Sequence, residues 1–479
     1  MQQSPSQYRQ ELAALANRIP AFEELRVFLE TSQKLDASPA TISRIRFNDN
    51  SATEFTDIAE ANLSKCLRPT QSSDLFVIEN VSAHVIELLG SQFDVEFDFW
   101  LEHVSNSNWF RLGDIEKHLP ALKSVRLDSR HTRHRFIGPR ELLLKTPVQF
   151  VKDRIEPEAG SARVPRVAGA LNPLERLPNR SHKDIWAKER FPPLALTRQH
   201  VSMWFDANEG SAGWNLGIIL LDPPFRPERD LGECQNPAYR SFVPRPQTQS
   251  RLTYHLSLIS CLKQDKNLQN GRIPCPFVVL GDMYRIIASE WIVVNTSLQR
   301  ELNTIEWNIE NEDARLERLH AHLNSLYTIR RRVTLYQVLI KEQREACRQH
   351  GRRYWDRSPS AGTNTLALEN VTNTLEMDFA FVADQVAKNQ ERVSKNVSLL
   401  MALISVAESR IMIANGRRVE ALALAAFFLV PFSLVSSVMN INGDLRMGGP
   451  RQYVFWVVSV PFSAVLGLGY MLYSRSWVS

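Results

Sequence analysis

Residues 419–439 read VEALALAAFFLVPFSLVSSVM, and residues 453–473 read YVFWVVSVPFSAVLGLGYMLY. Each stretch has about the 20 predominantly apolar residues that a helix needs to cross a bilayer. The first contains a single charge, at Glu420, and the second contains none. The two stretches therefore predict a C-terminal hairpin of two transmembrane helices, with spans at 419–439 and 453–473 and with the lipid bilayer as a partner.

The chain as a whole has the composition of a water-soluble protein. Charged residues make up 23% of its 479 residues, and the formal net charge is only +5. No basic run with interleaved aromatic residues is present, so we expect no nucleic-acid partner. The five cysteines are scattered without a C-x-x-C pair. Such a set is typical of a reducing compartment and argues against a zinc site or a disulfide framework.

The flanking charges predict the orientation of the hairpin. Arg410, Arg417 and Arg418 precede the first apolar stretch, and Arg475 follows the second. The first thirty residues contain no apolar segment typical of a signal peptide. Because cytoplasmic flanks carry the excess of Lys and Arg, we expect a multi-pass integral membrane protein with both termini in the cytoplasm. The residues do not address which membrane holds it.

The first part of the chain predicts a cytosolic α/β domain over residues 1–280. One or two short helices are expected in 7–31, and β-branched and aromatic residues predict strands. Ser82 is a good N-cap, and Gly90 a good stop, for a helix over 83–89. Residues 152–193 are rich in Pro and Arg and are interpreted as an exposed, partly disordered insertion. The other expected elements are strands at 74–79, 200–205 and 214–221 and a helix at 94–103.

The pattern becomes helical from about residue 281, which predicts a helical region with a stalk helix over 281–418 and a membrane domain over 419–479. Helices are expected at 281–311 and 313–350, followed by one from about Leu366 into the first span. Its apolar residues recur every three or four positions, as in a coiled coil, with Asn389 and Asn396 on or beside the seam. The seam serves either self-association or packing within one chain. Its apolar members are Leu375, Phe379, Val382, Val386, Val393, Leu400, Ile404, Ala407, Ile411 and Ala414.

Catalytic motifs are missing from the sequence. It has no Gly-rich phosphate loop, nucleophile elbow or HExxH motif. We therefore expect no enzymatic activity and no cofactor bound for catalysis.

A soluble α/β domain, a long stalk helix, two C-terminal spans and an Asn-bearing junction together resemble the CorA superfamily of divalent metal-ion transporters. The similarity is closest to its divergent fungal CorA-like branch. The strongest local match is PFSLVSSVMNIN at residues 431–442. Members of the family carry a Pro, a Thr or Ser two residues later, and Gly-Met-Asn after it. Weaker matches lie at 75–82, 87–91, 201–204, 222–224 and 330–332.

The resemblance places Pro431 on the family Pro and Ser433 on its hydroxyl position. The Gly-Met-Asn motif then falls on Asn440, Ile441 and Asn442, of which only Asn442 is kept. Asn440 is the best substitute for Gly where a positive φ is needed. Ile441 replaces a flexible thioether with a stiff β-branched side chain.

The resemblance also implies an α+β fold, a funnel-shaped homopentamer and a transported or regulatory divalent cation, Mg²⁺ or another. A ring of neutral amide oxygens suits Mg²⁺, which dehydrates reluctantly. Expected site residues are Asn442, Asn440 and Ile441 at the pore mouth, Ser437, Ser433 and Val430 along the pore, and Leu422 and Val419 at an apolar gate. Asp378 and Asp384 are candidate ligands of a regulatory metal between subunits.

Two basic segments have more than one interpretation. His131 and His134, in RHTRHR at residues 130–135, could lie near a metal or anionic lipid, although a solvated basic loop is the preferred interpretation. Arg330, Arg331 and Arg332 could contact lipid headgroups or a neighbouring subunit, or form a solvated helix face. For the whole chain, the alternative to a channel is a non-conducting, membrane-anchored scaffold or interaction protein.

Overall fold

The structure is a computed structural model that describes most of the chain. The described residues are 4–32, 39–48, 52–67, 72–104, 122–143, 167–171, 194–207, 214–223, 233–235, 253–265, 268, 274–311, 316–349, 364–439 and 453–478. They divide between two compact units. One comprises residues 1–311 with 325–396, and the other residues 312–324 with 397–479. The predicted domain boundaries stay predictions.

The described residues form a mixed α+β protein. Its strands are β1 (Thr41–Phe47), β2 (Glu54–Ile58), β3 (Ser73–Glu79), β4 (His131–Leu143), β5 (Val167–Leu171), β6 (Leu194–Ala207), β7 (Trp214–Leu221) and β8 (Glu233–Gln235). The short helices are α1 (Pro5–Arg18), η1 (Pro20–Phe22), α2 (Glu23–Ser32), η2 (Glu60–Asn62), α3 (Leu63–Cys66), α4 (Ala83–Phe93), α5 (Phe97–Val104), α6 (Lys123–Asp128) and α7 (Tyr254–Gln264). The long helices are α8 (Pro276–Asn311), α9 (Leu316–Arg348), α10 (Asn364–Met439) and α11 (Tyr453–Val478).

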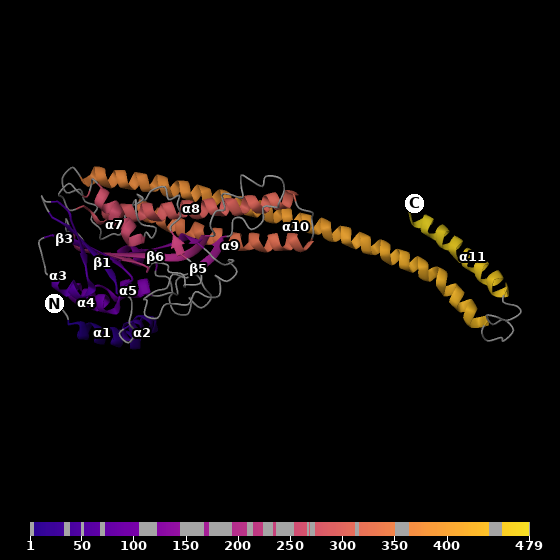
Figure 1. The fold of residues 1–479 in the computed structure, drawn as a ribbon, viewed down its shortest axis with the longest axis horizontal. Helices are drawn as coiled ribbons and strands as arrows, with labels where there is room; N and C mark the ends of the chain where they lie inside the picture. Colours follow the sequence, from indigo (N-terminus) through magenta and orange to yellow (C-terminus); the bar gives the residue numbers. More distant parts are fainter. Residues whose placement is uncertain are drawn as a thin grey trace. The chain divides into compact units, whose positions relative to one another are not determined.

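The eight described strands form one sheet in the order β2-β1-β3-β7-β6-β4-β8, with β5 paired to β6. Only the β3–β7 pair is parallel among the described pairs. Every residue of β3 is buried, as expected of a central strand covered on both faces. Helices α1, α2, α4 and α5 cover one face of the sheet, and α7 and α8 lie on the other (Figure 1).

The first core joins α1, α2, α4 and α5 to the sheet. Tyr8 of α1, Leu25 of α2 and Trp100 of α5 pack in the same buried cluster as Phe76 and Ile78 of β3. Each is at most 2% exposed. The strand predicted at 74–79 and the short helices predicted in 7–31 are confirmed.

Two predicted helix boundaries near this core are wrong. Helix α4 is capped by Ser82, as expected, but it continues through Gly90 to Phe93, and its C-cap Asp94 has a φ of 55°. Gly90 instead permits close packing, because a Cβ atom there would overlap the ring of Tyr8. Helix α5 begins at Phe97 rather than at 94. Within the predicted insertion at 152–193, residues Val167–Leu171 form a strand, and the rest lies outside the described residues.

Long helices pack beside the sheet in the first unit. Trp291 of α8 donates a hydrogen bond from Nε1 to Oε1 of Gln343 on α9, at 2.8 Å. The Gln343 amide in turn donates to the carbonyl of Arg135 on β4, also at 2.8 Å. Gln299 of α8 donates to Gln385 of α10 at 2.8 Å. The predicted succession of three long helices is confirmed, with the first beginning earlier, at Pro276.

Along much of its length, the apolar seam of α10 is buried by other residues of the same chain. Leu375, Val393 and Leu400 are completely buried, and Ile404 is 6% exposed. Ile411 is 47% exposed, so burial within the chain stops between these positions. The packing interpretation therefore holds from 375 to 404, and Ile411 remains free for other contacts.

Candidate pore face and metal sites

The predicted pore mouth, Asn440, Ile441 and Asn442, lies outside the described residues. Helix α10 is described up to Met439, immediately before it, and α11 begins at Tyr453. Of the helices in the described part of the chain, one, α10, contains a stretch long and apolar enough to cross a membrane. Only 6% of its most apolar window is buried in the structure, unlike the core helix of a soluble domain. The apolar stretch described in α11 is shorter, Tyr453–Phe462.

Five predicted site residues share one face of α10. Val419 and Ser437 are eighteen residues apart in one unbroken helix. At 3.6 residues per turn this is five full turns, so both side chains leave the helix in the same direction. Val430 and Ser433 lie within about 40° of that direction, and Leu422 within about 60°. We call these five residues the pore face, after the role that the sequence predicts for them.

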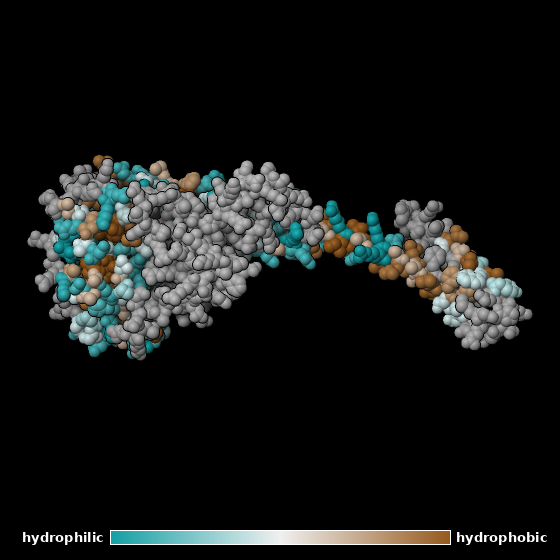
Figure 2. Space-filling model, viewed as in Figure 1, coloured by the Kyte–Doolittle hydropathy of each residue, from teal (hydrophilic) through white to brown (hydrophobic). Residues whose placement is uncertain are grey.

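The pore face is open to its surroundings within the single chain. Val419 is 64% exposed, Leu422 69% and Val430 60%. Ser433 and Ser437 are exposed as well. Figure 2 shows hydrophobic surface along this part of α10. Exposed apolar residues at this density need lipid or another protein surface to cover them.

The opposite side of α10 packs against α11. Val435 points about 160° away from Val419 and is only 7% exposed. The ring centroid of Phe432 lies 6.5 Å from that of Phe455 on α11. Phe455 is 9% exposed and Ser459 fully buried. Helix α11 therefore covers one side of α10 and leaves the pore face uncovered.

Two hydroxyl groups lie on the pore face one turn apart. Ser437 donates a hydrogen bond from Oγ to the carbonyl of Ser433 at 2.8 Å. This bond orients the hydroxyl along the helix and leaves its oxygen lone pairs available as acceptors. Neutral oxygens of this kind suit contact with a hydrated cation.

Asp378 and Asp384 do not share a site within one chain. They are six residues apart on α10, which places them about 120° from each other around the helix. Asp384 pairs with Lys388 at 2.6 Å. Burial raises the pKa of the Asp378 carboxyl, and the charge of Arg285 partly opposes this rise. In the described ranges, no group of three His, Cys, Asp or Glu side chains could hold a metal ion.

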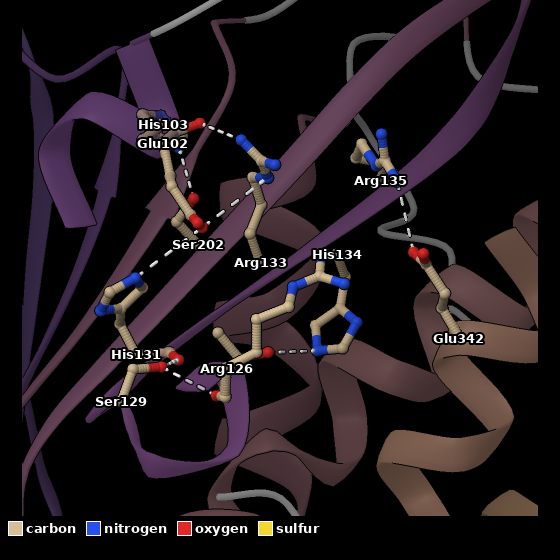
Figure 3. Close-up of polar contacts among 11 residues, drawn as sticks. Glu102, His103, Arg126, Ser129, His131, Arg133, His134, Arg135, Ser202 and Glu342 are labelled. Atoms are coloured by element: carbon tan, nitrogen blue, oxygen red, sulfur yellow. Dashed lines mark hydrogen bonds and ion pairs between the residues drawn. The ribbon is translucent and has the colours of Figure 1, made fainter. Parts of the chain in front are cut away.

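The segment containing His131 and His134 is a buried strand, so its preferred interpretation as a solvated loop is wrong. Strand β4 pairs with β6 in the register His131↔Trp204, and both histidines are at most 7% exposed. His131 Nε2 lies 3.8 Å from a carboxylate oxygen of Glu102 (Figure 3). His134 Nε2 forms a 2.8 Å hydrogen bond with the Tyr284 hydroxyl of α8.

The arginines of β4 are also partnered. Arg133 donates to the Glu102 carbonyl at 2.6 Å, and Arg135 donates to the Glu342 carboxylate at 3.3 Å (Figure 3). Burial lowers the pKa of both guanidinium groups. The strand was missed because charged residues dominate 130–135; the alternation of side chains leading into Phe136 and Ile137 was the available signal.

Sequence reasoning also missed a polar contact between α8 and α10. The Glu306 carboxylate accepts hydrogen bonds from Arg392, at 3.1 Å, and from Asn396, at 2.7 Å. Arg392 and Asn396 are four residues apart and so lie on one side of α10. That spacing was the available signal, although nothing in the sequence identifies Glu306 as the partner. Arg330 and Arg331, by comparison, are exposed, and all the interpretations given for this segment stay predictions.

Comparison with known proteins gives likenesses to solved structures alone. No family model and no curated protein matches the chain. Nineteen chains of known structure match. The full-length CmaX protein is 12% identical, with 92% of this chain and 99% of that one covered and a TM-score of 0.41. The CorA magnesium transporter from Methanocaldococcus jannaschii is 9% identical, with 91% and 98% covered and a TM-score of 0.39. At these values neither neighbour determines the function or the site residues of this chain.

Proposed function

We propose that this protein is a CorA-like membrane channel for divalent metal cations, in which α10 lines the pore. The observation that carries the proposal is the division of α10 into two sides. One side packs against α11, and the opposite side presents Val419, Leu422, Val430, Ser433 and Ser437, which no described residue of the chain covers. A symmetric ring of copies covers such a face and gives every copy the same environment.

The chemistry along the pore face suits cation passage. Ser437 and Ser433 supply neutral oxygens near the end of α10 that leads to Asn442. Leu422 and Val419 lie about three to five turns before them and form an apolar constriction, which closes by excluding water. In the assembly, the amides of Asn442 and Asn440 ring the mouth and hydrogen-bond the hydrated ion, with Ile441 between them.

The assembly we propose is a homopentamer with both helices α10 and α11 in the membrane and both termini in the cytoplasm. A regulatory cation bound between subunits by Asp378 and Asp384 belongs to the same proposal. Because these two carboxylates diverge around α10, each needs ligands from a neighbouring subunit.

A flux assay with the purified full-length chain in liposomes tests the proposal. We expect the wild-type protein to admit Mg²⁺ to an entrapped indicator, and Asn442→Ala to slow this entry. Asn373→Ala, at an exposed position of α10 in the first unit, is the matched control and keeps the wild-type rate. Zn²⁺, Co²⁺ and Ni²⁺ measured in parallel define selectivity.

A folded, inserted wild-type chain that passes none of these ions contradicts the channel. That result favours the alternative, a non-conducting membrane-anchored scaffold. Equal ion flux through the wild-type protein and Asn442→Ala would support conduction but show that Asn442 is not part of the selectivity site.

A further inference from the structure

Three arginines stand immediately before the apolar part of α10. Arg410, Arg417 and Arg418 are all exposed. Among the described residues, none of the three forms an ion pair with a carboxylate. The nearest acids along the helix are Glu408 and Glu420. The segment therefore presents excess positive charge at the point where the apolar stretch begins.

The direction of these side chains follows from the unbroken helix. Arg417 and Val435 are eighteen residues, or five turns, apart, so they point the same way. Arg410 lies seven residues before Arg417 and within about 20° of the same direction. Val435 is buried on the side that faces α11. Arg410 and Arg417 therefore point away from the pore face, and Glu408 lies on the opposite side of the helix from them.

Their depth matches the polar layer of a bilayer. At a rise of about 1.5 Å per residue, Arg417 and Arg418 lie within about 3 Å of Val419, where the apolar stretch begins. The headgroup layer on each side of the hydrocarbon is about 5–7 Å thick. Arg410 lies about 13 Å before Val419 along the helix, and its long side chain extends toward the layer.

Guanidinium groups at this depth favour one kind of ligand. Their planar, forked donors fit phosphate oxygens in a bidentate way. Because Arg410 and Arg417 turn away from the pore face, they do not repel a cation at the gate, and their side of the helix faces outward from the proposed ring. With α10 crossing the membrane as proposed, the anionic lipid of the cytoplasmic leaflet lies at that position.

We propose that Arg410 and Arg417, with Arg418 beside them, bind the phosphate groups of anionic phospholipids in the cytoplasmic leaflet. This proposal rests on α10 crossing the membrane, as the proposed function requires. It adds a lipid-binding surface on the outer side of α10, separate from the ion path.

Lipid retention by the full-length protein tests the proposal. The chain is placed in nanodiscs of phosphatidylcholine mixed with phosphatidylglycerol, and the lipids that stay bound after transfer to detergent are counted by native mass spectrometry. We expect the wild-type protein to retain phosphatidylglycerol preferentially. Each arginine replaced in Arg410→Gln and Arg417→Gln should lower this preference by about five-fold at low salt.

The control is the double variant Arg18→Gln with Lys65→Gln, which removes two exposed cations from α1 and α3 of the first unit and should keep the wild-type preference. Addition of inorganic phosphate distinguishes a site that binds lipid from one that binds any free phosphate anion. A preference that survives competing phosphate supports a lipid site, and one abolished by it overturns the proposal.

Two further outcomes are distinguishable. Equal retention of both lipids by an inserted wild-type protein, or an unchanged preference in the arginine variants, overturns the lipid site and leaves the channel proposal standing. Failure of the chain to float with vesicles of either composition overturns both proposals.

Discussion

Arg392 on α10 holds the carboxylate of Glu306 on α8, with its Nε donating to Oε1 at 3.1 Å. Asn396, one turn further along α10, donates to the same oxygen at 2.7 Å. Both Arg392 and Asn396 lie at the end of the α10 segment that belongs to the first unit. Glu306 therefore fixes α10 to α8 close to the point where the helix leaves that unit.

Replacing Glu306 with Gln should weaken this contact in a pH-dependent way. Burial raises the pKa of the Glu306 carboxyl, but the hydrogen bonds from Arg392 and Asn396 outweigh it, and the net pKa is lowered. A carboxyl with a lowered folded pKa stabilises the fold above its unfolded pKa, about 4.3. This contribution is lost as the pH falls through the folded pKa.

We therefore expect Glu306→Gln to speed amide hydrogen exchange in α8 and α10 at pH 7, by an amount equivalent to about 1 kcal/mol. The difference from wild type should shrink below about pH 4. Glu310→Gln, at an exposed position one turn further along α8, is the control. A pH-independent difference would show that the carboxylate charge is not involved.

Asp282 should make the stability of the fold depend on pH in the direction opposite to that expected for Glu306. Burial, with a smaller contribution from Asp265, raises the pKa of the Asp282 carboxyl to about 6. Its folded pKa thus exceeds the unfolded value of about 3.9, so the folded state binds the proton more tightly. The contribution of this carboxyl to the stability of the fold is fully present below about pH 4 and is lost as the pH rises through about 6.

We expect Asp282→Asn to raise the thermal unfolding temperature of the detergent-solubilised protein at pH 7.5 and to leave it unchanged at pH 4. The gain at neutral pH should be about 1–2 kcal/mol, because the charged form no longer has to be buried. Lower stability of the variant at pH 7.5 would mean that the charge of Asp282 is needed, for example by Arg285, 3.9 Å away.

Gly90 and Gly416 form a matched pair of glycine positions in helices. A Cβ atom at Gly90 would overlap the ring of Tyr8, whereas nothing lies within 4 Å of one at Gly416. Gly90→Ala should therefore destabilise the first unit by about 1–3 kcal/mol. Gly416→Ala should stabilise α10 by up to about 1 kcal/mol. Hydrogen exchange of α4 and of α10 measures both; equal effects would contradict the close packing of α1 on α4.

Asn389 is a buried amide on the α10 seam, 1% exposed. Neither its Nδ2 nor its Oδ1 has a hydrogen-bond partner in the part of the chain that the structure describes. Because an unpaired buried amide costs about 1–3 kcal/mol, Asn389→Leu should raise the thermal unfolding temperature. Loss of stability in this variant would mean that water or another subunit satisfies the amide, and Asn373→Leu, on the exposed surface, serves as the control.

Ser436 and Ser437 allow a direct test of the pore face. Both are exposed, but they point about 100° apart, and only Ser437 lies on the pore face. Ser437→Leu should slow Mg²⁺ flux in liposomes by narrowing and dehydrating the pore, while Ser436→Leu should keep it. The reverse ranking would move the pore to another side of α10.

Local patterns in the sequence were enough to predict the elements for which the burial pattern, the periodicity and the capping residues all favour one structure. The strand at 74–79, the cap at Ser82 and the three long helices were predicted because burial, periodicity and capping point to the same structure there. Strand β4 was not, because partners far along the chain, such as Glu102 and Glu342, offset the burial of its Arg133 and Arg135. The spacing of residues in the sequence does not show that Glu102 and Glu342 will lie beside these two arginines.

For the predicted pore residues, too, the sequence determined some properties and the tertiary structure determined others. The sequence alone determined that residues 419–439 are apolar and helical, and 3.6-residue periodicity then places Val419, Val430 and Ser437 on one face. Only the tertiary structure decided which face stays open, because that depends on where α11 packs, at Val435 and Phe455. The same holds for the seam of α10. Its spacing is fixed by the sequence, but whether it is buried by its own chain depends on contacts between residues far apart in the chain, which no local pattern encodes.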